Sequence, residues 1–528
     1  MDANTVDKDN SILQKRKVTN MRTSNSIKNV IVSVILGLVV IVANFVMQRY
    51  FVQTLGVQLL GLNSLFTNII SMLSVAELGF GSAVIFHLYK PLHENDMSSV
   101  SSLMRFYKLS YRSIAAIIAV AAIILAPFIP GIAGNPSVSV NIYFIYGLFV
   151  INCILSYLMS YKRSLLYADQ KNYIINIIHL SAIVIFNIVK VIALIITKSF
   201  YLFATISIVM TLAENILINR IVNKKYTLKV SPKPIDKTIK KDIFKQIGGL
   251  FFHKIGAFVV MGTDNIIISV ALGLQTLGLY SNYQLIQVAI QSLFSQISNA
   301  VRASIGNLLV DIGGKKSFTT FLRLQFANQV LSIISVSVFF VASRSLVRMW
   351  LGEKFVLDAW AVMALSLSLY ITLTRSVFGN FKEAAGIFYE DRLVPVVESL
   401  VNIVASLALV YAIGLPGVFL GTAISSMILH CYSYPKFVFK GLFHKSYKEY
   451  AIHILINTAL AFCAIGSSFI ISRMITMNNP LLQLIYDGVV AIIVPLFIIW
   501  LVYRKSDEYI YFKKLFTKTL RKLVKRHA

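Results

Sequence analysis

The chain has 528 residues, of which 57% are hydrophobic and only 14% are charged, and its mean hydropathy is +0.74. A soluble domain carries roughly 25% charged residues, so the composition excludes a soluble globular protein. The formal net charge of +28 agrees with the excess of Lys and Arg in the cytoplasmic loops of membrane proteins, and we expect no nucleic-acid partner.

Apolar runs predict an all-α polytopic membrane protein with about fourteen transmembrane helices. A basic tail, residues 1–27, precedes them and lacks the short apolar region and cleavage site of a signal peptide. The first six spans are expected over residues 28–50, 58–89, 110–131, 138–160, 172–196 and 200–221. After a basic linker, 222–246, six more are expected over 247–271, 277–309, 322–346, 356–379, 393–413 and 417–439. The last two, 450–473 and 481–503, precede a basic tail, 504–528.

The distribution of Lys and Arg indicates the orientation of these spans. Of the 50 basic residues, 40 lie in the two tails and the even-numbered connections, and 5 lie in the odd-numbered connections. Cytoplasmic segments carry the excess of Lys and Arg. We therefore expect both termini in the cytoplasm and an even number of spans.

An internal repeat divides the predicted spans into two lobes. Leu55–Ser64 matches Leu272–Ser281 at an offset of 217, with seven identities in ten positions. Residues 28–221 and 247–440 are therefore predicted to form an N-lobe and a C-lobe related as parallel repeats, an arrangement typical of transporters. Spans thirteen and fourteen, within 450–503, have no counterpart. The C-terminal tail is expected to form an amphipathic helix on anionic lipids of the inner leaflet.

Six segments carry a family resemblance, which depends on their order and spacing. They are 60–83, 163–171, 264–269, 304–308, 386–392 and 414–425. Together they resemble Wzx-type oligosaccharide flippases, in the superfamily that includes MATE drug exporters and the MurJ lipid II flippase. The resemblance extends over nearly the whole chain.

The resemblance implies a fold of two helical lobes that face each other across a central cavity. It implies a flippase that moves polyprenyl-diphosphate-linked oligosaccharide from the inner to the outer leaflet of a bacterial cytoplasmic membrane, for polysaccharide biosynthesis. A polysaccharide polymerase and glycosyltransferases are the implied protein partners. Neither a catalytic motif nor a cofactor is expected, and coupling to H⁺, Na⁺ or the membrane potential remains open.

Charged residues at membrane depth are the functional candidates, because burying each costs at least about 2.5–3.5 kcal/mol. A diphosphate needs Arg forks and Lys ammonium groups. We predict that Lys254, Arg302 and Arg375 bind it, and that Arg49 and Lys190 form a later relay nearer the outer face. Arg49 could instead be an interfacial anchor.

Polar residues within the spans are candidates for binding the sugar. These are Gln48, Asn68, Gln284, Gln287 and Gln291, of which the last three recur at helical spacing on one face of span eight. A polar stripe of this kind should not face lipid.

Four acidic residues are candidates for ion coupling or gating: Glu77, Glu214, Asp264 and Glu398. Glu77 could cap a helix that bends at the following glycines, and Glu398 could pair with Arg375. A direct pair of Glu214 with Lys190 is not expected, because their depths differ by roughly 15 Å.

Two other functions remain as alternatives. A cation-coupled MATE-like exporter of small molecules would not need several inward-facing Arg and Lys side chains. A membrane glycosyltransferase or polymer ligase should have a long outer loop with catalytic residues, and the predicted outer loops are short. No P-loop is present, and the three cysteines, at 153, 431 and 463, have no metal-ligand spacing.

Overall fold

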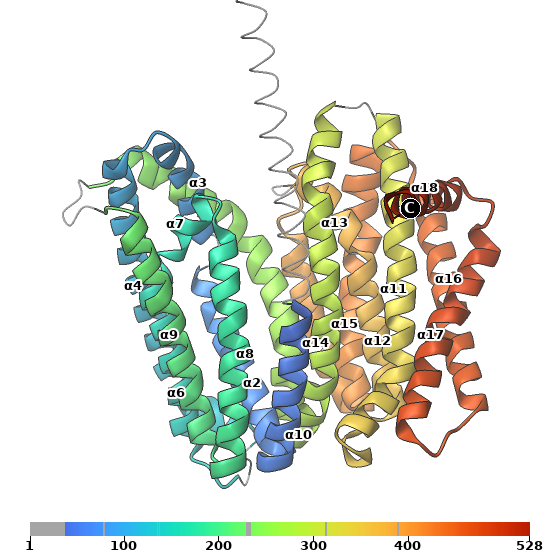
Figure 1. Ribbon diagram of the computed structural model, residues 1–528, viewed down its shortest axis with the longest axis horizontal. Helices are drawn as coiled ribbons and strands as arrows, with labels where there is room; N and C mark the ends of the chain where they lie inside the picture. The colour runs from blue at the N-terminus through green and yellow to red at the C-terminus, as the bar shows by residue number, and fades with distance from the viewer. Residues whose placement is uncertain are drawn as a thin grey trace, which may run out of the picture. The chain divides into compact units, whose positions relative to one another are not determined.

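The computed structural model describes residues 37–77, 80–134, 136, 138–228, 234–311, 314–387 and 390–527, and it leaves out some side chains within these ranges, chiefly those of 248–261 and 519–527. All the elements that it describes are helices (Figure 1). Twelve of them are long and apolar enough to cross a membrane. The predicted all-α, multi-pass membrane class is confirmed.

The predicted number of about fourteen spans is not confirmed, because one predicted span is divided into shorter helices and two others lie in one helix. The predicted span 58–89 is divided into α2 (Val57–Leu73), the 3₁₀ turn η1 (Ser74–Glu77) and α3 (Phe80–His93). The two predicted spans 247–271 and 277–309 both lie in α10 (Lys237–Asp311), whose helical conformation is interrupted at Gly273, with φ 83° and ψ 168°. Fourteen therefore remains a prediction.

The chain divides into two compact units, and each is described by itself. Unit 1 comprises the described residues of Met1–Leu55, Phe80–Val120 and Phe144–Ile243. Its elements are the helix Gly37–Leu55, α3, most of α4 (Met97–Leu125), α6 (Ile142–Ser160), α7 (Arg163–Ala168), α8 (Asn172–Thr197), α9 (Phe200–Lys225) and the start of α10.

Aromatic contacts hold the helices of unit 1 together. The Phe51 ring meets the Phe200 ring edge-on at 5.5 Å between centroids and the Phe203 ring at 4.8 Å, so the helix Gly37–Leu55 is fixed against the start of α9. Tyr111 of α4 packs on Tyr157 of α6 at 5.6 Å. Such pairs stabilise packing by about 0.5–1.5 kcal/mol beyond their buried area.

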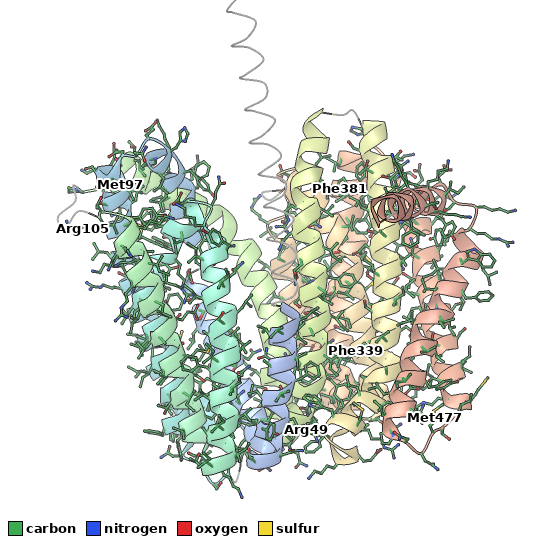
Figure 2. All side chains as sticks on the ribbon, viewed as in Figure 1. Arg49, Met97, Arg105, Phe339, Phe381 and Met477 are labelled. Atoms are coloured by element: carbon green, nitrogen blue, oxygen red, sulfur yellow. The ribbon has the colours of Figure 1, made fainter. Side chains whose placement is uncertain are left out.

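Unit 2 comprises Gly56–Gly79, Ala121–Tyr143 and Phe244–Ala528, as far as these residues are described. Its elements, besides α2, η1 and most of α10, are η2 (Ala126–Phe128), α5 (Ile129–Ile132), α11 (Gly314–Trp350), η3 (Glu353–Phe355), α12 (Ala359–Thr374), α13 (Ser376–Ala384), α14 (Val394–Ile413), α15 (Leu415–Ile428), the π-helical η4 (Leu429–Leu442), α16 (Tyr447–Met474), α17 (Pro480–Tyr503) and α18 (Asp507–His527). Figure 2 shows Phe381 near the end of this unit where α18 lies, and Met477 at the opposite end.

A close helix pair in unit 2 positions part of the candidate site. Gly414, with φ 70°, ends α14, and Pro416 is the second residue of α15. A Cβ at Gly417 would overlap the Leu409 carbonyl, and a Cβ at Gly421 would overlap Ser406. Small residues four apart allow helix backbones to approach in this way. The residue after Gly421, Thr422, is therefore held beside α14.

A second aromatic cluster lies between α11, α13 and η4. The Phe321 ring lies 5.2 Å from that of Phe378, 5.3 Å from that of Phe381 and 5.6 Å from that of Phe439. All four side chains are fully or almost fully buried. The cluster fixes α13, and with it the polar residues that α13 contributes to the site.

Backbone conformation supports the internal repeat independently of the sequence match. Positive φ angles occur in pairs separated by 216 to 218 positions: Gly56 (87°) and Gly273 (83°), Gly134 (72°) and Gly352 (111°), Gln170 (55°) and Gly386 (72°), and Lys198 (49°) and Gly414 (70°). Positive φ angles therefore recur at four corresponding positions of the two halves. The exact lobe boundaries remain a prediction.

The repeated segments themselves pack against each other inside unit 2. A Cβ at Gly61 of α2 would overlap the Leu274 carbonyl oxygen of α10, and a Cβ at Gly278 would overlap the Val57 carbonyl oxygen. Gly61 and Gly278 are equivalent in the repeat, as are Val57 and Leu274. The crossing is therefore reciprocal, and it needs glycine on both sides.

Candidate functional site

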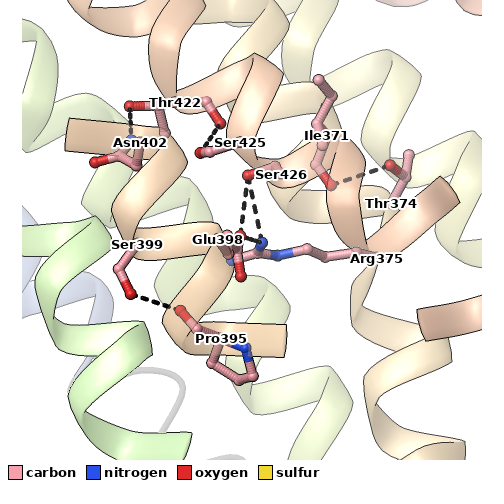
Figure 3. Close-up of polar contacts among 10 residues, drawn as sticks. All are labelled: Ile371, Thr374, Arg375, Pro395, Glu398, Ser399, Asn402, Thr422, Ser425 and Ser426. Atoms are coloured by element: carbon pink, nitrogen blue, oxygen red, sulfur yellow. Dashed lines mark hydrogen bonds and ion pairs between the residues drawn. The ribbon is translucent and has the colours of Figure 1, made fainter. Parts of the chain in front are cut away.

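Arg375 and Glu398 form an ion pair, which is the structural alternative considered from the sequence. The Arg375 Nη1 lies 2.9 Å from Oε1 of Glu398, and Ser426 lies 3.3 Å from the same oxygen (Figure 3). The Glu398 side chain is only 7% exposed. A buried carboxylate of this kind depends on its cation, because removing one partner of a buried pair costs about 3–5 kcal/mol.

Asp264 lies in a polar network without an ion pair among the described residues. The Thr422 hydroxyl is 3.0 Å from Oδ2 of Asp264 and accepts a hydrogen bond from the Asn402 amide at 3.0 Å. The Thr263 hydroxyl donates to Oδ1 of Asn402 at 3.0 Å. Figure 3 shows Asn402 of α14 and Thr422 of α15 facing each other. A carboxylate held only by neutral groups favours binding of a proton or a small cation.

Arg302, predicted to bind diphosphate, forms an ion pair and a hydrogen bond with two residues of α13. Its guanidinium lies 3.0 Å from Oε2 of Glu383 and 3.3 Å from Oδ1 of Asn380. Both side chains of the ion pair are nearly half exposed, so water weakens the attraction and the pair is exchangeable.

Glu214 is bound from two sides within unit 1. Arg163 Nη2 lies 2.9 Å from Oε1, and His179 Nδ1 lies 3.2 Å from Oε2. Arg163 also donates to Asn215 at 3.0 Å. The Glu214 charge is thus balanced by the first residue of α7, Arg163, and Lys190 has no part in it, as expected from the depths.

Lys190 lies within α8 next to an aromatic ring and has no ion pair in the described part of the chain. Its Nζ is 4.7 Å from the centre of the Phe203 ring. One turn earlier, Asn187 donates to Asn44 of the helix Gly37–Leu55 at 2.8 Å. The surroundings of this cation are therefore aromatic and amide groups.

The two remaining candidates for diphosphate binding, Arg49 and Lys254, have no described ion pair. Arg49 is exposed on the helix Gly37–Leu55 (Figure 2), and no ion pair of it occurs among the residues described. The side chain of Lys254 lies outside the described residues.

The candidate sugar-binding residues have different degrees of burial. Gln48 and Gln287 are buried at 8% and 7% exposure, whereas Gln284 and Gln291 are half-buried. Asn68 of α2 is also half-buried, and its Oδ1 has no hydrogen-bond donor in the described structure. Glu77, a coupling candidate, ends the 3₁₀ turn η1, at the predicted break of the second span.

Several polar partners were missed from the sequence. Arg163, Glu383 and Asn402 lie far along the chain from the residues they bind, so no local signal revealed them. Asp487 had a plain signal, a carboxylate inside an apolar run, and was overlooked. It is buried in α17, accepts a hydrogen bond from Gln483 at 2.8 Å, and is also bound by Ser345 of α11.

Charged groups within apolar helices, some of them held in ion pairs such as Arg375–Glu398 and Arg163–Glu214, are typical of a multi-pass membrane transporter. Comparison with solved structures agrees with this class. The fold is similar to that of the lipid II flippase MurJ in an inward closed conformation, with a TM-score of 0.62 and 16% identity, over 90% of this chain and 99% of that one. It is also similar to an inward-facing multidrug resistance MATE family transporter of the MOP superfamily (TM-score 0.58, 13% identity, 76% and 95% covered). The MATE transporter VcmN from Vibrio cholerae is a third (TM-score 0.54, 12% identity, 79% and 98% covered).

The sequence profile of the polysaccharide biosynthesis protein family matches residues 26–303, more than half of the chain. The chain therefore belongs to this family, and its fold is that of the flippases and transporters of the MOP superfamily. No curated protein sequence matches it.

Proposed function

We propose that this protein is a flippase that moves polyprenyl-diphosphate-linked oligosaccharide from the inner to the outer leaflet of the bacterial cytoplasmic membrane by alternating access. The membership of the polysaccharide biosynthesis family and the likeness to the MurJ fold support this proposal. Both termini lie in the cytoplasm in this proposal, and a polysaccharide polymerase and glycosyltransferases act on either side of the transport step.

Lys190 is the observation that favours this substrate class most. It is a cation inside an apolar helix, and the groups described around it are the Phe203 ring and the neighbouring Asn187–Asn44 amide pair. A diphosphate supplies the missing negative charge, and amide groups and aromatic faces suit a sugar. An exporter of organic cations would gain nothing from a lysine at this place.

Asp264 supports ion coupling in this proposal. Its carboxylate has only hydroxyl and amide groups around it in the described residues, so protonation or binding of Na⁺ would relieve an unpaired charge. An ion that binds one state of the transporter more tightly shifts the population toward that state. Arg302 is proposed to contact the diphosphate only after leaving Glu383, whereas Arg375 is expected to stay paired with Glu398.

Asp264 also favours the second candidate function, a cation-coupled exporter of small molecules. A single unpaired carboxylate in the membrane could bind an exported cation in place of a coupling ion. A polymer ligase is less favoured, because the connection between α16 and α17, an outer loop in the proposed topology, comprises only residues 475–479.

Transport by the purified protein in liposomes tests the proposal. We expect a fluorescent polyprenyl-diphosphate oligosaccharide to become accessible to an external quencher only when the protein is present. Lys190→Met should slow this at least about tenfold, and Lys190→Arg should retain part of the rate, because a charge-assisted hydrogen bond is worth about 1.5–3 kcal/mol. Lys505→Met, at an exposed cation after α17, is the matched control.

Uptake of a small organic cation, with no movement of the lipid-linked oligosaccharide, would overturn the flippase proposal and favour the exporter. Full flippase activity of Lys190→Met would leave the function standing and remove Lys190 from the site.

A further inference from the structure

Two lysines lie at one aromatic ring in unit 1, and an arginine lies one helical turn from the first of them. The Nζ atoms of Lys108 and Lys162 both lie 5.9 Å from the centre of the Tyr161 ring. Lys108 belongs to α4, whereas Tyr161 and Lys162 lie between α6 and α7. The contact of Tyr111 with Tyr157 holds α4 against α6 just beside this group.

Arg112, one turn after Lys108 on α4, adds a third positive charge. Burial raises the pKa of the Tyr161 hydroxyl, and the charge of Arg112 opposes that rise, so the guanidinium is near. Burial also lowers the pKa of Lys162, and the charge of Lys108 lowers it further. The three cations therefore repel one another in a partly dehydrated place.

No carboxylate balances these charges in the described part of the chain. Besides its contact with the ring, Lys162 donates a hydrogen bond to the neutral amide oxygen of Asn223 at 2.5 Å. The next residue, Arg163, differs in this respect, because it forms an ion pair with Glu214 at 2.9 Å. A group of positive charges with no carboxylate beside it favours the binding of an anionic ligand.

Exposed apolar side chains beside these cations indicate that the anionic group belongs to a lipid. Leu109 of α4 is 52% exposed and lies three residues before Arg112. Leu158 of α6 is 39% exposed and lies one turn before Lys162. Cations with exposed apolar residues beside them match the headgroup and the chain of a membrane lipid.

We propose that Lys108 and Lys162, at the Tyr161 ring, and Arg112, one turn further along α4, bind the phosphate headgroup of an anionic phospholipid of the surrounding membrane. Lys108 and Lys162 approach the phosphate from α4 and from the residues after α6, so one lipid joins the two helices. Arg112 contributes the planar guanidinium that binds two phosphate oxygens. The site is separate from the transported substrate.

Binding of short-chain phosphatidylglycerol to the full-length protein in a neutral detergent, measured by native mass spectrometry, tests this site. Lys108→Gln/Arg112→Gln/Lys162→Gln should raise the apparent Kd roughly 10- to 100-fold, given the contribution of each basic residue to lipid binding. Lys224→Gln/Lys448→Gln/Lys505→Gln removes the same charge at exposed positions and should leave the tightest binding event unchanged. Tyr161→Phe keeps the ring and should also bind. If the triple variant fails to fold, Arg112→Gln alone, at an exposed side chain, should still raise the Kd several-fold.

Equal binding of phosphatidylglycerol by the wild type and the triple variant would overturn the proposal. So would equally strong binding of inorganic pyrophosphate, because the ligand would then be a free anion. Displacement of phosphatidylglycerol by farnesyl diphosphate at a much lower concentration would overturn it as well, by assigning the site to a prenyl diphosphate. These measurements involve no transport, so their failure is distinguishable from a failure of the proposed function.

Discussion

The hydroxyl of Ser281 donates a hydrogen bond to the hydroxyl of Ser64 at 2.6 Å, across 217 positions of sequence. These two serines are equivalent positions of the internal repeat. The bond therefore lies where the two copies meet, one turn from the reciprocal contacts of Gly61 and Gly278. Reciprocal contacts between equivalent residues, such as those of Gly61 and Gly278, are the contacts that a two-fold axis produces, so a local two-fold axis passes between α2 and α10 near this bond.

Gly61→Ala and Gly278→Ala should each destabilise the protein by about 1–3 kcal/mol, because the added Cβ meets a backbone carbonyl that cannot rotate away. The two effects should be similar, since the contacts are reciprocal. Thermal unfolding in detergent measures them. Gly466→Ala in α16 is the control, because its Cβ would meet nothing within 4 Å. A loss of stability for the control equal to that for Gly61→Ala would show that the crossing is not the cause.

Arg375→Ala should reduce the folded yield strongly, because it leaves the buried Glu398 carboxylate without its cation. Arg375→Ala/Glu398→Ala should recover both folding and flippase activity if the pair is structural, which is the outcome we expect from the geometry. Size-exclusion profiles and the liposome assay are the measurements. A double variant that folds but does not transport would instead support Arg375 as a diphosphate contact.

Asp264→Asn should fold normally and lose the dependence of transport on an ion gradient, because the amide cannot take up a proton or balance a cation. Initial rates with an imposed Na⁺ or pH gradient, compared with no gradient, measure this. Thr422→Val, which removes the hydroxyl 3.0 Å from the carboxylate, should weaken the dependence. Asp507→Asn, at the start of α18, is the control. Unchanged ion dependence in Asp264→Asn would remove this carboxylate from coupling.

The orientation of the chain is tested by labelling single cysteines in a variant that lacks Cys153, Cys431 and Cys463. A membrane-impermeant maleimide added outside intact cells should label a Cys at Asn478, in the connection between α16 and α17. It should not label a Cys at Ser446, which precedes α16. This expectation follows from the distribution of Lys and Arg, of which 40 lie in the tails and even-numbered connections and 5 in the odd-numbered connections. External labelling at Ser446 would reverse the proposed topology.

The helices were predictable because hydropathy and length are local properties of the sequence. The predicted limits 172–196 and 450–473 lie within a few residues of α8 and α16. The repeat was predictable from identities alone, and the positive φ angles of Gly56 and Gly273 recur at its offset. A bend of the second span was considered from the glycines after Glu77, but the 3₁₀ turn at Ser74–Glu77 just before them was not predicted.

The polar pairs were mostly not predictable. Sequence position gives the depth of a residue along a helix, but not the direction in which its side chain points. Arg375 and Glu398 lie on consecutive predicted spans at similar depth, so their pairing could be considered. Arg302 and Glu383 are 81 positions apart, and Glu383 lies in a predicted connection, so no depth argument linked them. Asp487 shows that a visible signal can also be overlooked.

The reciprocal glycine crossing has the form of an interface between two identical subunits, in which residue i contacts j and j contacts i. Here both halves belong to one polypeptide, so the interface forms by an intramolecular step that does not depend on protein concentration. Covalent linkage also frees equivalent positions to differ. The position equivalent to Asp264 in the first half is Met47, so the molecule has one carboxylate here, where a symmetric dimer would carry two.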